Sequence, residues 1–532
     1  MKIIEKILFP LVVCATAFGQ FPSQIKNVVV IVQENRTPDN LFHFLTPACP
    51  IPTGATGYQA CTPRPVTNRC YDVSPCGLSN QTGTVVPVTL TGVPLAGTAD
   101  PDHLHRGFEN MCDPDSTFKC RNDGAWKTAT NGLAYGYVLN PVVTNYDGST
   151  GHLLDPYLTF AKQYGWANFM YQTNQGPSYP AHQFLFSGTS ARTNRDDGLS
   201  IFVSANFWGS SSAGCLLPAS TATTPVFGLL LQPTKSPTVG CTLLDNKSVQ
   251  ECKVYNAIDA NNVGTFCSTS NNMATTVLDP NAISWKYYAP SDLPIWAAPN
   301  AIRSICDPQP DGAGGLMCAG TEWAANVDLS NHGTGILGDI TNCKLSRVSW
   351  VIPDGAWSDH AGPNDQYGPS WVAAVVNAIG NNPTCPGGTP DAGQNFWQNT
   401  VIVVTWDDWG GWSDNQPALV GRGLPCVLTQ PPTPCPGDYQ FGFRVPLVIV
   451  SAYTPRGFID DTTHDFGSIL RMIEGINHLK EGMMGNADAR SGTDLHGFFT
   501  LTQPRQYHAV PAVEDANFFL TYSAAVIAPD TD

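Results

Sequence analysis

The sequence predicts an α/β protein with a mostly parallel central sheet flanked by helices. Three observations support this prediction: short runs that are apolar throughout, helical patterns between these runs, and a composition low in charge but rich in turn formers. Hydrophobic residues make up 42% of the 532 residues, which excludes a disordered chain. Only 13% are charged, and there are 49 Gly and 44 Pro. The low share of charged residues and the high content of Gly and Pro disfavour a mostly helical bundle and predict long, neutral loops.

Four short apolar runs are predicted to form the core strands. They lie at residues 27–32 (NVVVIV), 347–352 (RVSWVI), 401–405 (VIVVT) and 445–450 (VPLVIV). Strands that are apolar on both faces, rather than alternating, are typical of a parallel sheet covered by helices on both sides. The four runs therefore predict a buried parallel sheet.

Helical patterns lie between the strand-like runs. Apolar residues recur at helical spacing in residues 152–164, 371–379 and 467–476. No internal repeat, long charge block or extended linker divides the chain. We therefore expect one interrupted α/β domain at residues 20–480.

The domain is expected to carry additions at its surface. Insertions are predicted at about 45–95 and 205–275, where cysteines gather in loop-like sequence. A C-terminal extension, residues 481–532, is expected to pack on the same domain.

The N-terminal segment 1–19 has the pattern of a secretory signal peptide. Lys2 and Lys6 give a positively charged start before an apolar stretch that is too short to span a bilayer, and small residues precede Gln20. A lipoprotein that uses Cys14 is the less favoured alternative, because the LVVC sequence lacks a small residue before the cysteine. No later segment has eighteen consecutive apolar residues. We therefore expect a secreted or periplasmic protein without a stable membrane anchor.

The cysteine pattern agrees with export. The chain has 17 cysteines, and an even number remains once Cys14 is removed with the signal peptide. In an oxidising compartment these are expected to form disulfides that staple loop insertions. No C-x-x-C spacing occurs, so structural zinc has little support. The loop-like clusters are Cys49, Cys61, Cys70 and Cys76; Cys215, Cys241, Cys252 and Cys267; and Cys426 and Cys435.

Acidic and amide side chains follow two predicted strands. Glu34 and Asn35 come just after the first run, and Asp407 and Asp408 come just after the third. The carboxyl ends of parallel strands meet at one edge of a sheet, where ligands bind. Hard oxygen ligands from two strands suit a divalent cation. The alternative is that each pair merely caps the following helix or turn.

Ser178 is a candidate nucleophile. It lies in the turn Gln175-Gly176-Pro177-Ser178, ahead of an apolar run, and is expected at a helix N-terminus, where backbone N–H groups stabilise anions. The alternative role is a helix-capping hydroxyl. No G-x-S-x-G elbow is present, which argues against an ordinary serine hydrolase.

Few of the 11 histidines have a context that points to chemistry. His360 follows the second strand-like run and His464 follows the fourth, which favours both over an isolated histidine. His103 lies in the segment Asp-His-Leu-His. The sequence around His332 does not decide whether that histidine has a structural or a chemical role. The histidines without such a context are His43, His152, His478, His496 and His508.

Taken together, these motifs resemble those of the bacterial phosphoesterases. That family includes phospholipases C and a group of acid phosphatases, and it belongs to the alkaline phosphatase-like superfamily. The resemblance runs in order from about residue 27 to 474, and its QENR and WDDWGG blocks are specific when they occur together. The segments that carry it are NVVVIVQENRTPDNLF at 27–42, QGPSYPAHQFLFSGT at 175–189, SWKYY at 284–288, WSDH at 357–360, TWDDWGGWSDN at 405–415 and GFRVPLVIVSAYTPRGFI at 442–459.

The resemblance implies an alkaline phosphatase-like fold and a role for each matched residue. It implies one divalent metal ion, and Ca, Mn, Mg, Zn or Fe remain open. Ser178 would be both nucleophile and metal ligand. His103, His360 and, less directly, His464 would hold phosphoryl oxygens or protonate the leaving group. The other implied metal ligands are Glu34, Asn35, Asp407 and Asp408.

Two positions depart from the family pattern. The family usually has Asp-His after W-D-D-x-G-G, whereas Asp414 is followed here by Asn415. The usual G-P-[ST]-x-P-N-R motif ends here in Ala181-His182. Recognition next to the nucleophile is therefore expected to differ from that of the family.

The resemblance implies metal-dependent hydrolysis of a phosphoester through a covalent phosphoseryl intermediate. The substrate would be a phosphorylated small molecule or a phospholipid head group, which the sequence does not distinguish. The net charge of −16 disfavours nucleic-acid binding and means that a phosphorylated substrate needs a local cation. An inactive ligand-binding protein and a sulfatase-like esterase are the alternatives, although the Arg of the sulfatase motif is missing. Oligomeric state is left open.

Overall fold

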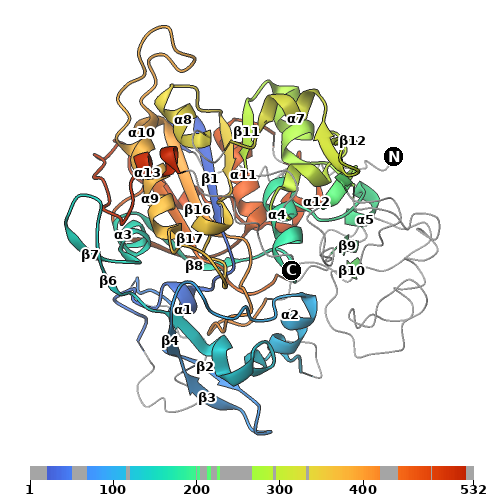
Figure 1. The fold of residues 1–532 in the computed structure, drawn as a ribbon, viewed down its shortest axis with the longest axis vertical. Helices are drawn as coiled ribbons and strands as arrows, with labels where there is room; N and C mark the ends of the chain where they lie inside the picture. The colour runs from blue at the N-terminus through green and yellow to red at the C-terminus, as the bar shows by residue number, and fades with distance from the viewer. Residues whose placement is uncertain are drawn as a thin grey trace, which may run out of the picture.

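The computed structural model describes residues 21–50, 61, 69–115, 120–198, 201–203, 213–216, 225–227, 267–290, 295–330, 335–419, 441–480 and 482–522. The predicted signal peptide, His332, Cys241, Cys252, Cys426 and Cys435 lie outside these residues. At the centre is an eight-stranded sheet with the order β14-β11-β15-β1-β16-β17-β8-β18 (Figure 1).

Five of the seven strand pairings in this sheet are parallel, so the predicted fold class is confirmed. The predicted runs form β1, β15, β16 and β17, and four further strands extend the sheet. The strands are β1 (Asn27–Gln33), β8 (Gly165–Tyr171), β11 (Trp285–Tyr288), β14 (Val327–Asp328), β15 (Val348–Val351), β16 (Thr400–Trp406), β17 (Leu447–Ser451) and β18 (Phe458–Asp465).

The apolar run at 445–450 was predicted to form a parallel strand, but β17 is antiparallel to its neighbours. It pairs antiparallel with β16 and with β8, and Leu447 lies opposite Thr405. The chain leaves β16 at the carboxyl edge of the sheet and enters β17 at that same edge. No crossover helix occurs in the described parts of the connection, residues 407–419 and 441–446. Because β17 begins at the edge where β16 ends, it runs back in the opposite direction.

Helices cover both faces of the sheet. In Figure 1, α3, α9, α10 and α13 lie on one side, whereas α4, α11 and α12 lie on the other. The three predicted helices are present as α3, α9 and α11. The helices are α1 (Pro38–Leu41), α2 (His105–Cys112), α3 (Asp155–Gln163), α4 (Ser178–Ser187), α5 (Asn194–Gly198), α7 (Thr321–Asn326), α8 (Gly335–Thr341), α9 (Gly368–Gly380), α10 (Phe396–Asn399), α11 (Phe466–Ile476), α12 (Asn486–Arg490) and α13 (Ala516–Thr521).

The core lies between the sheet and these helices. Every residue of β1, β15, β16 and β17 is buried, as expected for strands covered on both faces. Helix α11 buries ten of its residues against the same core. The apolar runs in the sequence therefore mark the interior of the sheet.

Small two-stranded sheets lie outside the central sheet. They pair β2 with β3, β4 with β5, β6 with β7, β9 with β10, and β12 with β13. Their bounds are β2 (Cys76–Ser79), β3 (Val86–Thr89), β4 (Thr91–Val93), β5 (Gly136–Val138), β6 (Val142–Thr144), β7 (Thr150–His152), β9 (Ile201–Val203), β10 (Pro225–Phe227), β12 (Asp307–Pro310) and β13 (Leu316–Ala319).

Disulfides staple the loops, as the cysteine count predicted. Two of them close the region near residues 45–95, and Cys215–Cys267 spans most of the second predicted insertion. All twelve cysteines that the structure describes are paired. The pairs are Cys49–Cys70, Cys61–Cys76, Cys112–Cys120, Cys215–Cys267, Cys306–Cys318 and Cys343–Cys385.

The C-terminal segment contacts the domain through α9. Tyr507 donates a hydrogen bond from its hydroxyl to Asn377 Oδ1 at 2.6 Å, and Phe519 of α13 packs on Trp371. The domain limits themselves remain a prediction.

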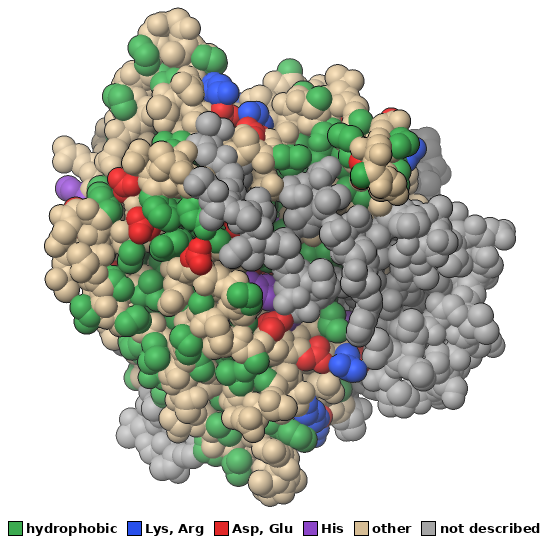
Figure 2. Space-filling model, viewed as in Figure 1, with side chains coloured by type: hydrophobic (Ala, Val, Ile, Leu, Met, Phe, Trp, Pro, Cys, Tyr) green, Lys and Arg blue, Asp and Glu red, His purple; other side chains and the backbone are tan. Residues whose placement is uncertain are grey.

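The exposed face in Figure 2 shows few charged side chains, and these are scattered among neutral and apolar ones. This distribution follows from the low share of charged residues in the sequence. Within the described ranges, no helix combines the length and the apolar character needed to cross a bilayer.

Candidate functional site

The ends of β1 and β16 place four oxygen-bearing side chains next to each other. Gln33 is paired with Trp406 at the last step of the parallel ladder, so Glu34 and Asn35 leave the sheet beside Asp407 and Asp408. These four side chains are fully buried. The backbone N–H of Asn35 donates to Asp407 Oδ1 at 2.9 Å, which joins the two strand ends.

Two unusual backbone conformations let these strand ends approach. Asn35 has a φ of 61°, in the left-handed region that asparagine tolerates better than most residues. Gly410 has a φ of 62°, and a Cβ there would lie 2.2 Å from the Asn35 backbone oxygen. The first glycine of the WDDWGG block is therefore required both for its backbone conformation and for space.

Ser178 is the first residue of α4 and points at the strand ends. Strand β8 leads through residues 172–177 into this helix, so the hydroxyl reaches the carboxyl edge of the sheet. Ser178 Oγ lies 3.2 Å from Asn35 Oδ1 and 3.2 Å from Asp408 Oδ2. The helix N-terminus at Ser178 favours negative charge on that oxygen.

His182 belongs to the same cluster, although we did not predict it. It lies one helical turn after Ser178 on α4, and its Nε2 is 3.1 Å from Glu34 Oε1 and 3.7 Å from Asp407 Oδ2. Burial lowers the pKa of this histidine to about 4, although nearby Asp407 opposes the shift. The i, i+4 spacing from Ser178 in a segment predicted to begin a helix was the available indication.

His103 and His360 line the other side of the cluster. His103 Nε2 lies 2.9 Å from Asn35 Nδ2, and its Nδ1 lies 2.8 Å from the Pro101 carbonyl oxygen. The rings of His103 and His360 have centroids 5.7 Å apart. Asp100 has an oxygen 3.5 Å from His103 Nδ1, so it joins these histidines as a residue that the sequence reasoning missed.

Trp296 packs against two of the histidines. Its ring centroid lies 6.4 Å from His182 and 6.1 Å from His360. It is 2% exposed, so this part of the cluster has an apolar wall. Its role was also missed, because no short motif marks it in the sequence.

The structure does not bring His464 into this cluster. His464 lies inside β18, the edge strand, which is separated from β16 by β17 and β8. Its Nδ1 is 2.6 Å from Thr493 Oγ1, and its Nε2 is 3.5 Å from Asp460 Oδ2. His464 therefore lies within a strand that the apolar pattern did not reveal.

The three buried carboxylates repel one another. Burial, and then the charge of Asp407, raise the pKa of Glu34 well above its usual value. The same two causes raise the pKa of Asp408. Among the residues that the structure describes, Glu34 Oε2 and Asp407 Oδ2 have no hydrogen-bond partner. Buried oxygens without partners and mutual repulsion both fit a bound cation, and the donor set is of the kind that holds one.

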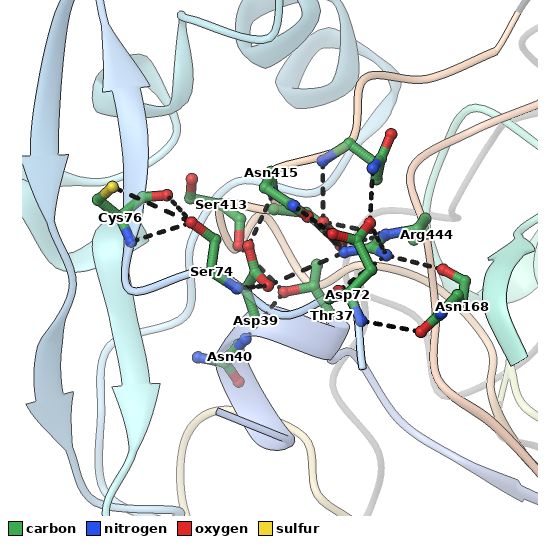
Figure 3. Close-up of polar contacts among 12 residues, drawn as sticks. Thr37, Asp39, Asn40, Asp72, Ser74, Cys76, Asn168, Ser413, Asn415 and Arg444 are labelled. Carbon is green, nitrogen blue, oxygen red and sulfur yellow. Dashed lines mark hydrogen bonds and ion pairs between the residues drawn. The ribbon is translucent and has the colours of Figure 1, made fainter. Parts of the chain in front are cut away.

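A second buried network supports the loop that carries Asp407 and Asp408. Arg444, just before β17, is fully buried and forms an ion pair with Asp72 at 3.1 Å (Figure 3). It forms a second ion pair with Asp414 at 2.5 Å. Asp39 lies 3.9 Å from the same guanidinium. Although burial opposes its charge, Asp414, Asp72 and Asp39 together raise the pKa of Arg444.

Asn415 faces this network rather than Ser178. Its side-chain oxygen accepts from Arg444 Nη2 at 2.6 Å, and its Nδ2 donates to Asp72 Oδ1 at 3.0 Å. Its backbone N–H donates to Asp39 Oδ2 at 2.8 Å, as Figure 3 shows. The residue that replaces the usual histidine therefore helps to anchor the loop after β16.

The sequence profile described as "Phosphoesterase family" matches residues 25–480. Over 147 residues the chain is 30% identical to the "Non-hemolytic phospholipase C" of Burkholderia pseudomallei (strain K96243), with 26% of this chain and 19% of that protein covered. Over 143 residues it is 26% identical to the "Hemolytic phospholipase C" of Pseudomonas aeruginosa, with 26% and 18% covered. The matched segment thus spans about a fifth of these relatives.

A solved structure of a protein in the alkaline phosphatase superfamily from Vibrio parahaemolyticus is also similar to the chain. The alignment has a TM-score of 0.30 and 9% sequence identity. It covers 79% of this chain and 72% of that one.

Proposed function

The chain belongs to the Phosphoesterase family, and from this premise we propose that it hydrolyses phosphoesters with Ser178 as the nucleophile. The observation that carries the proposal is the position of the Ser178 hydroxyl. It lies 3.2 Å from both Asn35 Oδ1 and Asp408 Oδ2, at a helix N-terminus and away from bulk water. A hydroxyl beside a carboxylate and a helix N-terminus is suited to become an alkoxide.

The proposed reaction has two steps. Ser178 Oγ forms a bond to phosphorus, the bond from phosphorus to the ester oxygen breaks, and the leaving alcohol takes up a proton. Water then attacks phosphorus and breaks its bond to Ser178 Oγ, which regains a proton, so inorganic phosphate or a phosphomonoester is released. This sequence of steps is ordinary nucleophilic catalysis at phosphorus.

His103 and His360 are proposed to act on the phosphoryl group. They lie across the cluster from α4, and His103 is held by Asn35 and Pro101. From there they would hold the equatorial oxygens or protonate the leaving alcohol. The proposal leaves out His464, because its contacts are with Asp460 and Thr493.

The proposal includes one divalent metal ion, with Ca, Mn, Mg, Zn and Fe as candidates. When bound, the ion would supply positive charge that favours the alkoxide form of Ser178 and polarises a phosphoryl oxygen. The residues that would hold it, Glu34, Asn35, Ser178, Asp407 and Asp408, are all buried at the ends of two strands and one helix. A cation there would also reverse the local effect of a net charge of −16 on an anionic substrate.

Substrate and export are parts of the same proposal. The phospholipase C names of the relatives favour a phospholipid head group, and a phosphorylated small molecule is the other class. The six disulfides among the described residues and the sequence of residues 1–19 favour a secreted or periplasmic enzyme.

The proposed function is tested with three chromogenic substrates: p-nitrophenyl phosphate, bis-p-nitrophenyl phosphate and p-nitrophenyl phosphorylcholine. We expect hydrolysis of at least one, complete loss with EDTA, and recovery when a divalent ion is returned. Which substrate is preferred assigns the class of phosphoester. Failure to hydrolyse all three after reloading with each candidate ion would contradict the proposal.

Asp408→Asn tests the metal site. The variant keeps the shape of the side chain but removes one charged ligand, so we expect divalent-ion affinity to fall by more than about 100-fold, since even an outer-shell partner is worth 10–100-fold. Because Asp408 is repelled by its neighbours, the metal-free variant should unfold at the same temperature as the metal-free parent or above it. Elemental analysis and calorimetric titration measure the first effect.

The matched control is Asp147→Asn, because Asp147 is fully exposed. It should bind the ion like the parent. Unchanged metal content and turnover in Asp408→Asn would show that this carboxylate is not a ligand.

A further inference from the structure

His182 is placed where a ligand of the proposed ion would be. Its side chain is 1% exposed, and it reaches the carboxylates from α4, on the same helical face as Ser178. The ring packs on Trp296 at an interplanar angle of 21°, which fixes its orientation. The nitrogen that faces the strand ends is Nε2.

The distances fit a shared ion. Two neighbouring ligands about 2.1 Å from one ion lie about 3.0 Å apart when six ligands are arranged octahedrally and about 3.4 Å apart when four are arranged tetrahedrally. His182 Nε2 lies 3.1 Å from Glu34 Oε1 and 3.7 Å from Asp407 Oδ2, close to these separations. One oxygen from each acid and one ring nitrogen of His182 all lie within 4.8 Å of one another.

Within the described residues, the polar contacts of the His182 ring are made by Nε2, to the carboxylates of Glu34 and Asp407. Among the described residues, His182 Nδ1 has no hydrogen-bond partner, so the polar contacts of the ring are those of Nε2. If the Nε2 lone pair points at Glu34 and Asp407, the three groups repel each other. A cation between them removes that repulsion and uses the same lone pair.

The position also departs from the resembled family. The segment that begins Gly176-Pro177-Ser178 has His182 where the family motif has an arginine. An arginine has no lone pair and cannot bind a metal ion, whereas a neutral imidazole can. The replacement therefore changes a fixed positive charge into a donor nitrogen.

We propose that His182 Nε2 is a ligand of the divalent ion, together with Glu34 and Asp407, and that this mixed donor set selects Zn²⁺ or Fe²⁺ over Ca²⁺ and Mg²⁺. The inference rests on the metal site of the proposed function. Imidazole suits zinc and iron, whereas calcium and magnesium take oxygen ligands. A nitrogen in the first coordination sphere is thus the feature that decides the metal.

The test compares wild-type protein, His182→Gln and His152→Gln. His152 is half exposed and pairs with Asp155 at the surface, so its variant is the matched control. X-ray absorption of the zinc-loaded wild type should show imidazole scattering, and His182→Gln should show one imidazole fewer. Zinc affinity should fall at least about tenfold in His182→Gln, with calcium affinity little changed; His152→Gln should match the wild type in both measurements.

The outcomes distinguish a failure of the proposed role of His182 from a failure of the proposed metal-dependent function. Zinc bound with no imidazole scattering in the wild type, or with the same scattering in His182→Gln, would overturn the role of His182 and leave the metal-dependent function standing. A wild type that binds none of the divalent ions would overturn both. The wild-type spectrum decides the point even if His182→Gln does not fold.

Discussion

Ser178→Ala is expected to lower kcat by about 10³-fold or more, with the fold unchanged. The hydroxyl that forms the proposed covalent bond is removed, and its loss is felt in the transition state rather than in substrate binding. Ser178 Oγ contacts Asn35 and Asp408, and removing it creates little space. We therefore expect KM and thermal stability to stay close to those of the parent.

The control for this variant is Ser187→Ala, at the other end of α4. Ser187 is 5% exposed and, within the described part of the chain, its hydroxyl has no hydrogen-bond partner. Its loss should leave kcat unchanged. Rapid quenching with phosphorus-labelled substrate should place the label on the peptide that contains Ser178. Near-normal turnover of Ser178→Ala without any labelled peptide would mean that water is the direct nucleophile. Label on another residue would make that residue the nucleophile, and either result would overturn the role of Ser178.

Arg444→Met is expected to cost about 3–5 kcal/mol of unfolding free energy, because it leaves buried carboxylates without their cation. Asp39, Asp72 and Asp414 are at most 2% exposed, so water cannot take the place of the guanidinium. The loss is a large share of the roughly 5–15 kcal/mol that holds a typical domain together. Urea unfolding, compared at equal ionic strength, measures it.

A second change separates charge from packing in this network. Adding Asp414→Asn to Arg444→Met removes one of the unpaired charges, so the double variant should regain part of the lost stability. Arg456→Met, at an exposed arginine, is the control and should change stability by less than about 0.5 kcal/mol. If Arg444→Met were as stable as this control, the network would contribute no net stability.

The local sequence determined the sheet and the meeting of the two acidic pairs. Runs such as Val28–Val32 are apolar at every position, and this pattern is possible only for strands covered on both faces. Because β1 and β16 are parallel neighbours, the residues that follow them must emerge at one edge. Placing Ser178 at a helix N-terminus needed only the turn before it.

Other features were decided by the tertiary structure, because they depend on contacts between segments far apart in the chain. The direction of β17 depends on the path of the connection from β16, which the apolar pattern of the strand does not encode. His464 lies in the strand at the far edge, so its place depends on strand order and not on the adjacent sequence.

The same reason explains His182 and the Arg444 network. His182 meets Glu34 across 148 positions, and Asn415 meets Asp39 across 376. Periodicity shows which face of a helix or strand is buried, but it does not show which distant side chain lies opposite. That choice is made only when the packed elements bring buried charges together, because each of them must then find a partner in the same small volume.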